Sequence, residues 1–445
     1  MDMQKRWIIL FVALLSISFL GLFYSGHEGV FTDIDSNLNF ADIAWMITAT
    51  IFVLMMTPGL SFFYGGMVRS KNVISTMLQS FIAMGVISVI WVVVGFSLAF
   101  GEDVGHFIGN PGTFFMFVNV GGATDKLLAP TIPLALYALF QMKFAIITPS
   151  LITGSFAERV RFSGYLVFMI LFCIFVYCPL AHWTWHPDGF LRQMGVLDFA
   201  GGIVVHASSG VAALAGAIFL GRRKESGQPA NIPFVLLGAA MLWLGWFGFN
   251  AGSSLAANSI AVKAFLNTNT ASATAMMTWV VFDCLRGRKP SAMGAAIGAV
   301  VGLVAITPSA GYVTVGESIF IALVVTVICN MAVSWKNKKN SFDDALDVFP
   351  THGVGGIVGT IMTGIFVYNA TENITYWQNL LNHIIAVVIV CGYTFIVTYA
   401  LYWITDKMIP MRVSEKSEKI GLDMSQHDER YGIETNRELA EYFDH

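Results

Sequence analysis

The sequence predicts an all-α integral membrane protein with about eleven transmembrane helices. Of its 445 residues, 56% are hydrophobic and only 12% are charged, a balance that no soluble core can bury. Apolar runs of roughly twenty residues, long enough to cross the hydrocarbon core of a bilayer as helices, recur along the chain. The alternating pattern of a membrane β-barrel is missing, so helices are expected.

Eleven apolar runs define the predicted spans in chain order. The first five lie near 41–64, 75–100, 131–153, 163–181 and 199–220. The next six lie near 232–256, 271–286, 291–307, 316–335, 353–369 and 380–404. Small residues such as the Gly201-Gly202 and Gly355-Gly356 pairs allow the backbones of neighbouring helices to approach closely.

Basic residues predict the orientation, because short cytoplasmic loops carry the excess of Lys and Arg. They follow the odd-numbered spans one to nine as Arg69, Lys71, Arg159, Arg161, Arg222, Arg223, Lys224, Arg286, Arg288, Lys289, Lys336, Lys338 and Lys339. The opposite loops hold only Lys126, Arg192 and Lys263. A cell (inner or plasma) membrane protein is therefore expected, with the core beginning outside and the C-terminus in the cytoplasm.

Three parts follow from this pattern. Residues 1–26 contain an apolar run behind Lys5 and Arg6 that fits either a signal peptide or an extra N-terminal helix. Residues 27–405 form the transmembrane domain, and residues 406–445 form a polar cytoplasmic tail.

Composition argues against several classes of function. A net charge of −3 without a basic face makes nucleic acid an improbable partner. The five cysteines fall inside apolar runs without metal-ligand spacing, so no metal or other cofactor is expected. No nucleophile lies at a useful spacing from a base, which argues against an enzyme.

Two histidines stand in equivalent places. Asp198 precedes His206 in the fifth span, and Asp344 precedes His352 at the start of the tenth, each by eight residues. If spans one to five and six to ten form an inverted 5+5 repeat followed by a final helix, the two histidines meet at mid-membrane. Ionisable side chains inside a membrane tend to face a cavity, and paired imidazoles suit a small molecule that exchanges a proton.

Other polar and aromatic residues admit two interpretations. Asp198 fits either a cation site or a cap on a helix start, and the cap is favoured. Aromatic residues concentrate near the outer half of the spans, in the stretches 140–144, 183–185 and 243–249. Their faces can hold a dehydrated cation, although any single Trp there is equally well explained as an interfacial belt residue.

Four stretches, 154–161, 198–206, 245–253 and 352–359, resemble the signatures of the ammonium transporter (Amt/Rh) family, of the bacterial or archaeal Amt type. The resemblance extends from about residue 40 to 431. It implies a homotrimer with a central pore in each subunit, and a role in ammonium transport and nitrogen assimilation. By matching motif it implies an outer gate of Phe140 and Phe144, an ammonium-binding site of Phe144, Trp185 and Ser253, a pore lined by His206, His352, Trp246 and Phe249, and structural support from Asp198.

The sequence departs from the family pattern at two places. Lys143 replaces a small or apolar residue beside the gate, and it is expected to face away from Phe144 and to snorkel or form an ion pair. Asp428 replaces a glycine in the tail, whose family counterpart packs under the neighbouring subunit and binds a PII-type signalling protein.

The implied mechanism begins with ammonium shedding its water at the outer aromatic site. The ion is deprotonated near the gate, and ammonia crosses a narrow apolar pore past His206 and His352. Potassium has no neutral form in which to follow. Transfer of the proton along the imidazoles would make transport electrogenic. An electroneutral ammonia channel and an ammonium sensor that signals through its tail are the alternatives.

Overall fold

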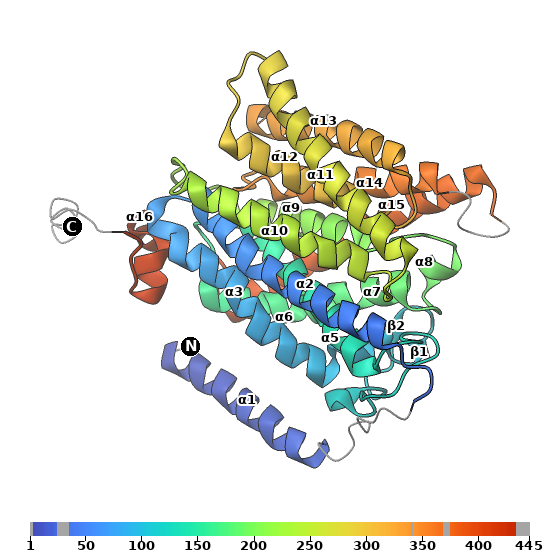
Figure 1. The fold of residues 1–445 in the computed structure, drawn as a ribbon. Helices are drawn as coiled ribbons and strands as arrows, with labels where there is room; N and C mark the ends of the chain where they lie inside the picture. Colours follow the sequence, from blue (N-terminus) through green and yellow to red (C-terminus); the bar gives the residue numbers. More distant parts are fainter. Residues whose placement is uncertain (1–2, 25–34, 340, 368–373, 433–445) are drawn as a thin grey trace.

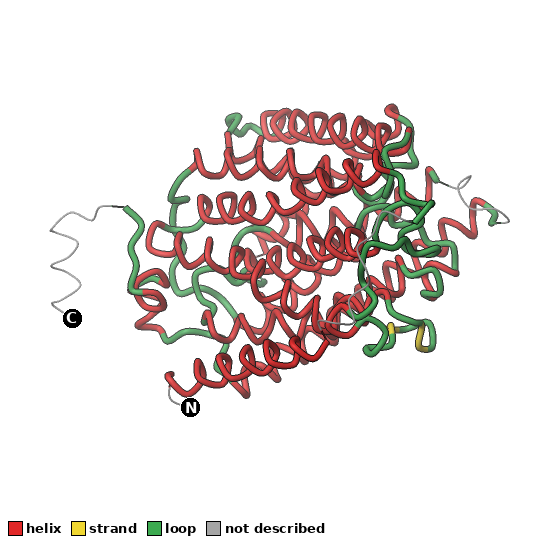
Figure 2. The backbone as a smooth tube through the Cα atoms, turned by 60° about the horizontal axis from the view of Figure 1, so that its bottom comes forward, coloured by secondary structure: helices red, strands yellow, loops and turns green. Residues whose placement is uncertain are grey.

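The protein is a bundle of helices running side by side (Figures 1 and 2). A computed structural model describes residues 3–24, 35–339, 341–367 and 374–432. The first helices are α1 (Met3–Tyr24), α2 (Phe40–Met67), α3 (Val73–Ile90), α4 (Phe96–Phe100), α5 (Leu134–Ile152), α6 (Phe162–Phe172), α7 (Cys178–Trp185) and α8 (Phe190–Gln193). The later ones are α9 (Ser208–Leu220), α10 (Ile232–Gly252), α11 (Ser259–Leu285), α12 (Ala292–Ile306), α13 (Val315–Lys339), α14 (Val354–Phe366), α15 (Tyr376–Met408) and α16 (Glu415–Ile420).

Short π-helical turns join several of these helices into longer rods. They are η3 (Trp91–Gly95), η6 (Cys173–Tyr177), η7 (Gly202–Ala207), η8 (Phe349–Gly353) and η10 (Asp423–His427). Strands β1 (Asp103–Val104) and β2 (Ile108–Gly109) form a small antiparallel hairpin beyond α4. Because π turns are frequent at functional sites in helices, the two that carry histidine, η7 and η8, are of particular interest.

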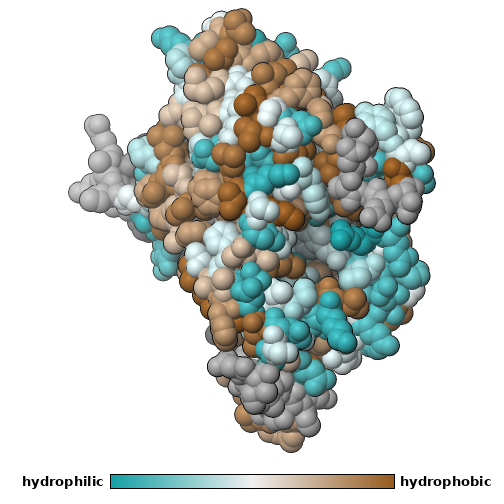
Figure 3. Space-filling view, turned by 45° about the vertical axis from the view of Figure 1, so that its right-hand side comes forward, coloured by the Kyte–Doolittle hydropathy of each residue, from teal (hydrophilic) through white to brown (hydrophobic). Residues whose placement is uncertain are grey.

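Eight helical segments in the described part of the chain are long and apolar enough to cross a membrane. They are Phe40–Met67, Ser70–Phe100, Leu134–Ser155, Phe162–Gln193, Gly202–Leu220, Ile232–Gly252, Val315–Lys339 and Tyr376–Met408. Large apolar side chains lie exposed on the outside of the bundle, and Figure 3 shows broad apolar areas on one face beside a polar region. The multi-pass membrane fold expected from the sequence is confirmed at this level.

The remaining predicted spans, near 271–286, 291–307 and 353–369, overlap α11, α12 and α14. The start of the first of these was placed too late. Helix α11 begins at Ser259, where the side chain of Asn258 accepts a hydrogen bond from Ala261 N at 2.9 Å and caps the helix. Lys263 and the polar residues 267–270 interrupt the apolar run in its first half, so hydropathy alone placed the start too late.

The two ends of the chain lie differently. Helix α1 runs beside the bundle near α3 (Figure 1), and its cleavage remains a prediction. The tail, in contrast, contacts the start of α3 in the same chain. Asp423 Oδ1 accepts from Ser75 N at 2.8 Å, and Oδ2 accepts from Ile74 N at 3.0 Å. Asp428 has φ of 56°, a left-handed backbone that explains why glycine suits this position.

Candidate functional site

His206 and His352 meet at the centre of the bundle. Each lies in a π turn at the start of a helix, His206 in η7 before α9 and His352 in η8 before α14. Their Nδ1 atoms are 3.4 Å apart, and their ring planes are inclined by 30°. Only 1% and 3% of the two residues' surfaces are exposed. The structure thus brings together the two histidines that the sequence spacing singled out.

Close backbone packing makes this meeting possible. A Cβ atom added to Gly210 of α9 would collide with the backbone of Gly353 in η8. One added to Gly356 of α14 would lie 2.6 Å from the backbone nitrogen of Ala207. Since real Cβ atoms do not approach so closely, glycine at both positions allows the two histidine-bearing rods to cross in contact.

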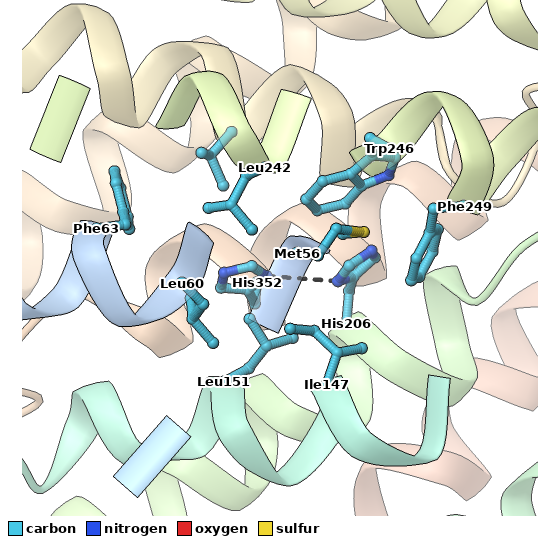
Figure 4. Close-up of a pocket in the computed structure, with 11 residues that line it drawn as sticks. Met56, Leu60, Phe63, Ile147, Leu151, His206, Leu242, Trp246, Phe249 and His352 are labelled. Carbon is cyan, nitrogen blue, oxygen red and sulfur yellow. Dashed lines mark hydrogen bonds between the residues drawn. The ribbon is translucent and has the colours of Figure 1, made fainter. Parts of the chain in front are cut away.

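A small enclosed chamber surrounds the imidazoles (Figure 4). It has a volume of about 10 Å³, which is close to the space needed by one water molecule. Its walls are Met56, Leu60, Phe63, Ile147, Leu151, His206, Leu242, Trp246, Phe249, Val300 and His352. The indole N–H of Trp246 donates to Thr307 Oγ1 at 2.9 Å. Apart from the two histidines and Trp246, every residue that lines the chamber is apolar.

An unbroken series of aromatic rings leads outward from His206. Its ring centroid lies 5.8 Å from that of Phe249, which lies 4.3 Å from that of Phe144. Phe140 contacts Phe144 edge-on at 4.9 Å, and both are almost completely buried. This contact pairs the two phenylalanines that the family resemblance implies as an outer gate.

Beyond Phe144 lies an outer vestibule of about 270 Å³. It is lined by Tyr137, Gln141, Phe144, Trp185, Arg192, Asp198, Phe199, Ser253, Ser254, Leu255, Ile260 and Tyr312. Trp185 packs edge-on against Phe144 at 5.8 Å. The hydroxyl of Ser253 donates to Phe249 O at 2.8 Å, which leaves its oxygen lone pairs free to accept. The structure therefore places the three residues of the implied ammonium-binding site around one cavity.

Sequence reasoning missed several vestibule residues. Tyr137 lies two turns and Gln141 one turn before Phe144 on α5, where helical periodicity could have found them. Gln141 Oε1 is buried without a hydrogen-bond partner in the described part of the chain. Arg192 of α8 and Tyr312 of the loop before α13 come from distant segments, and no sequence signal connects them.

Asp198 caps the first histidine-bearing turn. Its Oδ1 accepts from Gly201 N and Gly202 N at 2.9 and 2.6 Å, and its Oδ2 accepts from Ile203 N and Val204 N at 2.9 and 3.2 Å. Both oxygens are therefore engaged by the backbone. Asp198 thus caps η7 through its side chain, and its carbonyl oxygen accepts from the Trp185 indole at 2.9 Å.

Asp344 has the corresponding place before the second histidine-bearing turn. Its Oδ2 accepts from Phe349 N at 2.7 Å at the start of η8, while Lys336 Nζ donates to its carbonyl oxygen at 2.6 Å. Lys336 also pairs with Asp347. These contacts hold the second histidine-bearing turn.

Lys143 does not line the vestibule, in agreement with the expectation that it faces away from it. The expected snorkelling is wrong, however. Only 8% of the residue is exposed, and its Nζ lies 3.8 Å from Met142 Sδ. Because nearly all of α5 is buried among neighbouring helices, the side chain is enclosed within the bundle.

No group of three or more His, Cys, Asp or Glu side chains in the described residues is placed to hold a metal ion. What the geometry provides is a polar outer vestibule, an aromatic barrier and a buried histidine pair, all in a multi-pass helical bundle. These features define a membrane transporter for a small solute.

Comparison with known proteins identifies the family. Residues 44–431 match the model of the Ammonium Transporter Family. A putative ammonium transporter of Methanothermobacter thermautotrophicus is 45% identical over 402 residues, covering 88% of this chain and 98% of the relative. An ammonium transporter of Aquifex aeolicus is 42% identical over 422 residues, covering 93% and 99%. The chain belongs to the ammonium transporter family.

Solved structures agree with this assignment. The crystal structure of Candida albicans Mep2 superposes with a TM-score of 0.80 at 35% identity, covering 86% of this chain and 89% of that one. The structure of a sensor Amt protein superposes with a TM-score of 0.81 at 29% identity, covering 87% and 98%. The fold is therefore that of a multi-pass membrane transporter.

Proposed function

We propose that this ammonium transporter recruits ammonium in the outer vestibule, removes a proton near Phe144 and conducts ammonia past His206 and His352 with net movement of charge. The observation that carries the proposal is the contact between two imidazoles in a chamber that is otherwise almost wholly apolar. Such a chamber admits a small neutral molecule and rejects a bare ion.

Recruitment rests on the rings and hydroxyl of the vestibule. Ammonium placed among Phe144, Trp185 and Ser253 gains cation–π attraction of about 0.5–2 kcal/mol per ring. The hydroxyl oxygen of Ser253 accepts a hydrogen bond from one N–H group of the ion. Asp198 holds no free oxygen for the ion, because both are bonded to backbone amides. Its role is to fix η7 and Trp185.

Selectivity rests on the gate and the chamber. Phe140 and Phe144 exclude water from the path to His206, so a permeant ion would lose its hydration without replacement. Ammonium avoids this desolvation cost because it loses a proton and enters the pore as neutral ammonia. Potassium cannot, and is therefore rejected.

The histidine pair offers the route for that proton. One imidazole donates and the other accepts across the Nδ1–Nδ1 contact, which leaves one nitrogen of each ring to face substrate. His206 Nε2 has no hydrogen-bond partner in the described part of the chain. A proton relayed over the two rings follows ammonia and makes transport electrogenic.

The wider assembly belongs to the same proposal. Eleven spans form a 5+5 inverted repeat with a final helix, each subunit of a homotrimer holds its own pore, and the core begins outside the cell membrane. The parallel placement of His206 and His352, each after a capping aspartate in a π turn, supports the repeat. A PII-type protein binds at the cytoplasmic tail.

Two other functions differ from this one in measurable ways. An electroneutral channel carries ammonia without charge, and the same apolar chamber would serve it. A sensor binds ammonium and signals through the tail, which is docked on α3 through Asp423; a sensor Amt protein shares the fold.

The deciding measurement is current across reconstituted membranes on addition of ammonium, with potassium as control. A saturable current specific to ammonium supports the electrogenic transporter. Ammonia flux without current replaces it with the neutral channel. Binding of ammonium with neither flux nor current replaces it with the sensor.

A further inference from the structure

A basic side chain lies at the outer vestibule, where a cation is to be recruited. Among the described residues that line this cavity, only Arg192 and Asp198 are charged. Both Asp198 oxygens accept backbone N–H bonds, and 4% of the residue is exposed. Arg192 is exposed. The vestibule therefore contains one engaged, buried negative charge and one solvent-facing positive charge.

The position of Arg192 is fixed by its surroundings. It lies in the short helix α8. The residue before it, Leu191, is fully buried. The backbone nitrogen of Phe190, at the start of α8, donates a hydrogen bond to the carbonyl oxygen of His106 at 3.3 Å. Just after α8, the carbonyl oxygen of Met194 accepts from Asn382 Nδ2 at 2.6 Å. This segment is thus tied to the outer hairpin and to α15, which keeps the guanidinium at the cavity.

Among the described residues, Arg192 forms no ion pair with a carboxylate, although Asp198 lines the same cavity and Asp125 acts on Tyr137 of the lining. Its guanidinium interacts with the Tyr312 side chain, a neutral group. The nearby Lys263 donates to Tyr312 O at 3.4 Å and adds positive charge. Charges within a Debye length, about 8–10 Å at physiological salt, act on each other appreciably, and a cavity of about 270 Å³ is smaller than that across.

We propose that Arg192 sets the affinity of the outer vestibule by repelling ammonium, so that the Michaelis constant for transport is governed by a positive charge at the recruitment site. The inference rests on the proposed function of this cavity. The aromatic rings and Ser253 attract the cation, and Arg192 opposes them. Because the repulsion acts through solvent, it is screened by salt, and ammonium binds more tightly as ionic strength rises.

A charge series at position 192 tests the proposal in proteoliposomes of neutral lipid, with ammonium-evoked current or uptake as readout. Relative to wild type, Arg192→Gln should lower KM by about two- to fivefold and Arg192→Glu should lower it further. Arg192→Lys keeps the charge and should keep the wild-type KM. The maximal rate should be similar throughout, since position 192 lies outside the gate and the chamber. Lys126→Gln, an equal change of charge away from the lining, is the matched control.

Wild-type protein alone provides a second test that no folding defect can obscure. Its KM should fall when an impermeant salt is added, and the KM of Arg192→Gln should respond less. An unchanged KM in Arg192→Gln, a KM insensitive to salt in wild type, or Arg192→Lys behaving like Arg192→Gln would each overturn the proposal. A wild-type protein that moves no ammonium would instead refute the proposed function.

Discussion

The Nδ1 atom of His206 lies 3.4 Å from the Nδ1 atom of His352, and each side chain stands in a π turn at the start of its helix. The arrangement places the polar edges of two imidazoles in contact where the surroundings are apolar. It sets the chemistry of the chamber, and the capping aspartates and glycines around it serve to hold it.

The first prediction concerns the relay itself. Replacing His352 or His206 with alanine removes one half of the proton path and enlarges the chamber. Ammonium-evoked current should fall by at least about a hundredfold, the range associated with a positioned proton-transfer group. A variant that retains wild-type current and ammonium selectivity over potassium would contradict the relay. Correct folding is checked by thermal unfolding of the purified variant.

A second prediction concerns the crossing of the two rods. Gly210→Ala adds a methyl group that collides with the backbone of Gly353, so the helices must separate and His352 must shift. Destabilisation of about 1–3 kcal/mol is expected from such overpacking, together with loss of transport. Gly392→Ala on α15 is the matched control, because its added Cβ meets nothing within 4 Å. Equal melting temperatures for the two variants would contradict the packing argument.

Asp198 gives a third prediction. Asp198→Asn keeps an oxygen for two of the four backbone N–H groups and turns an amide NH₂ towards the others. Buried donors left without partners cost about 1–3 kcal/mol, so the unfolding free energy should fall by about that amount. Thermal unfolding in detergent measures it. An unchanged melting temperature would show that the four hydrogen bonds do not hold η7. It would then favour the alternative hypothesis that the carboxylate binds ammonium directly.

The fourth prediction is a pH dependence of tail docking. Burial raises the pKa of Asp423 to about 6 from its ordinary value of 3.8, against the opposing effect of the amides of Ser75 and Ile74. The docked carboxyl thus holds its proton more tightly than a free one. Its contribution to docking is fully present below the ordinary pKa and is lost as the pH rises through about 6.

Hydrogen exchange of the tail amides measures this dependence. After correction for intrinsic rates, protection of residues 421–427 should be greater at about pH 5.5 than at about pH 7.5. Asp423→Asn, which does not titrate, should remove this decrease and leave the opposite contribution of His427, whose pKa is lowered by burial. Protection that increases with pH in the wild-type protein would contradict the prediction.

The sequence predicted the features that depend on short-range pattern. Hydropathy located most spans, and the eight-residue spacing from Asp198 to His206 and from Asp344 to His352 indicated the pair. The vestibule could not be predicted in full, because Arg192 and Tyr312 reach it from segments far apart in the chain. The burial of Lys143 also escaped prediction, since enclosure of α5 on all sides arises only from packing.

The size of the central chamber has a consequence for kinetics. A space of about 10 Å³ holds a single molecule the size of water or ammonia, so two cannot pass each other beside the histidines. Inward and outward movement then compete for one place. The ratio of inward to outward tracer flux should therefore differ from the ratio expected for independent diffusion. Ammonia that accumulates inside the cell should slow further uptake, because it occupies the single place beside the histidines.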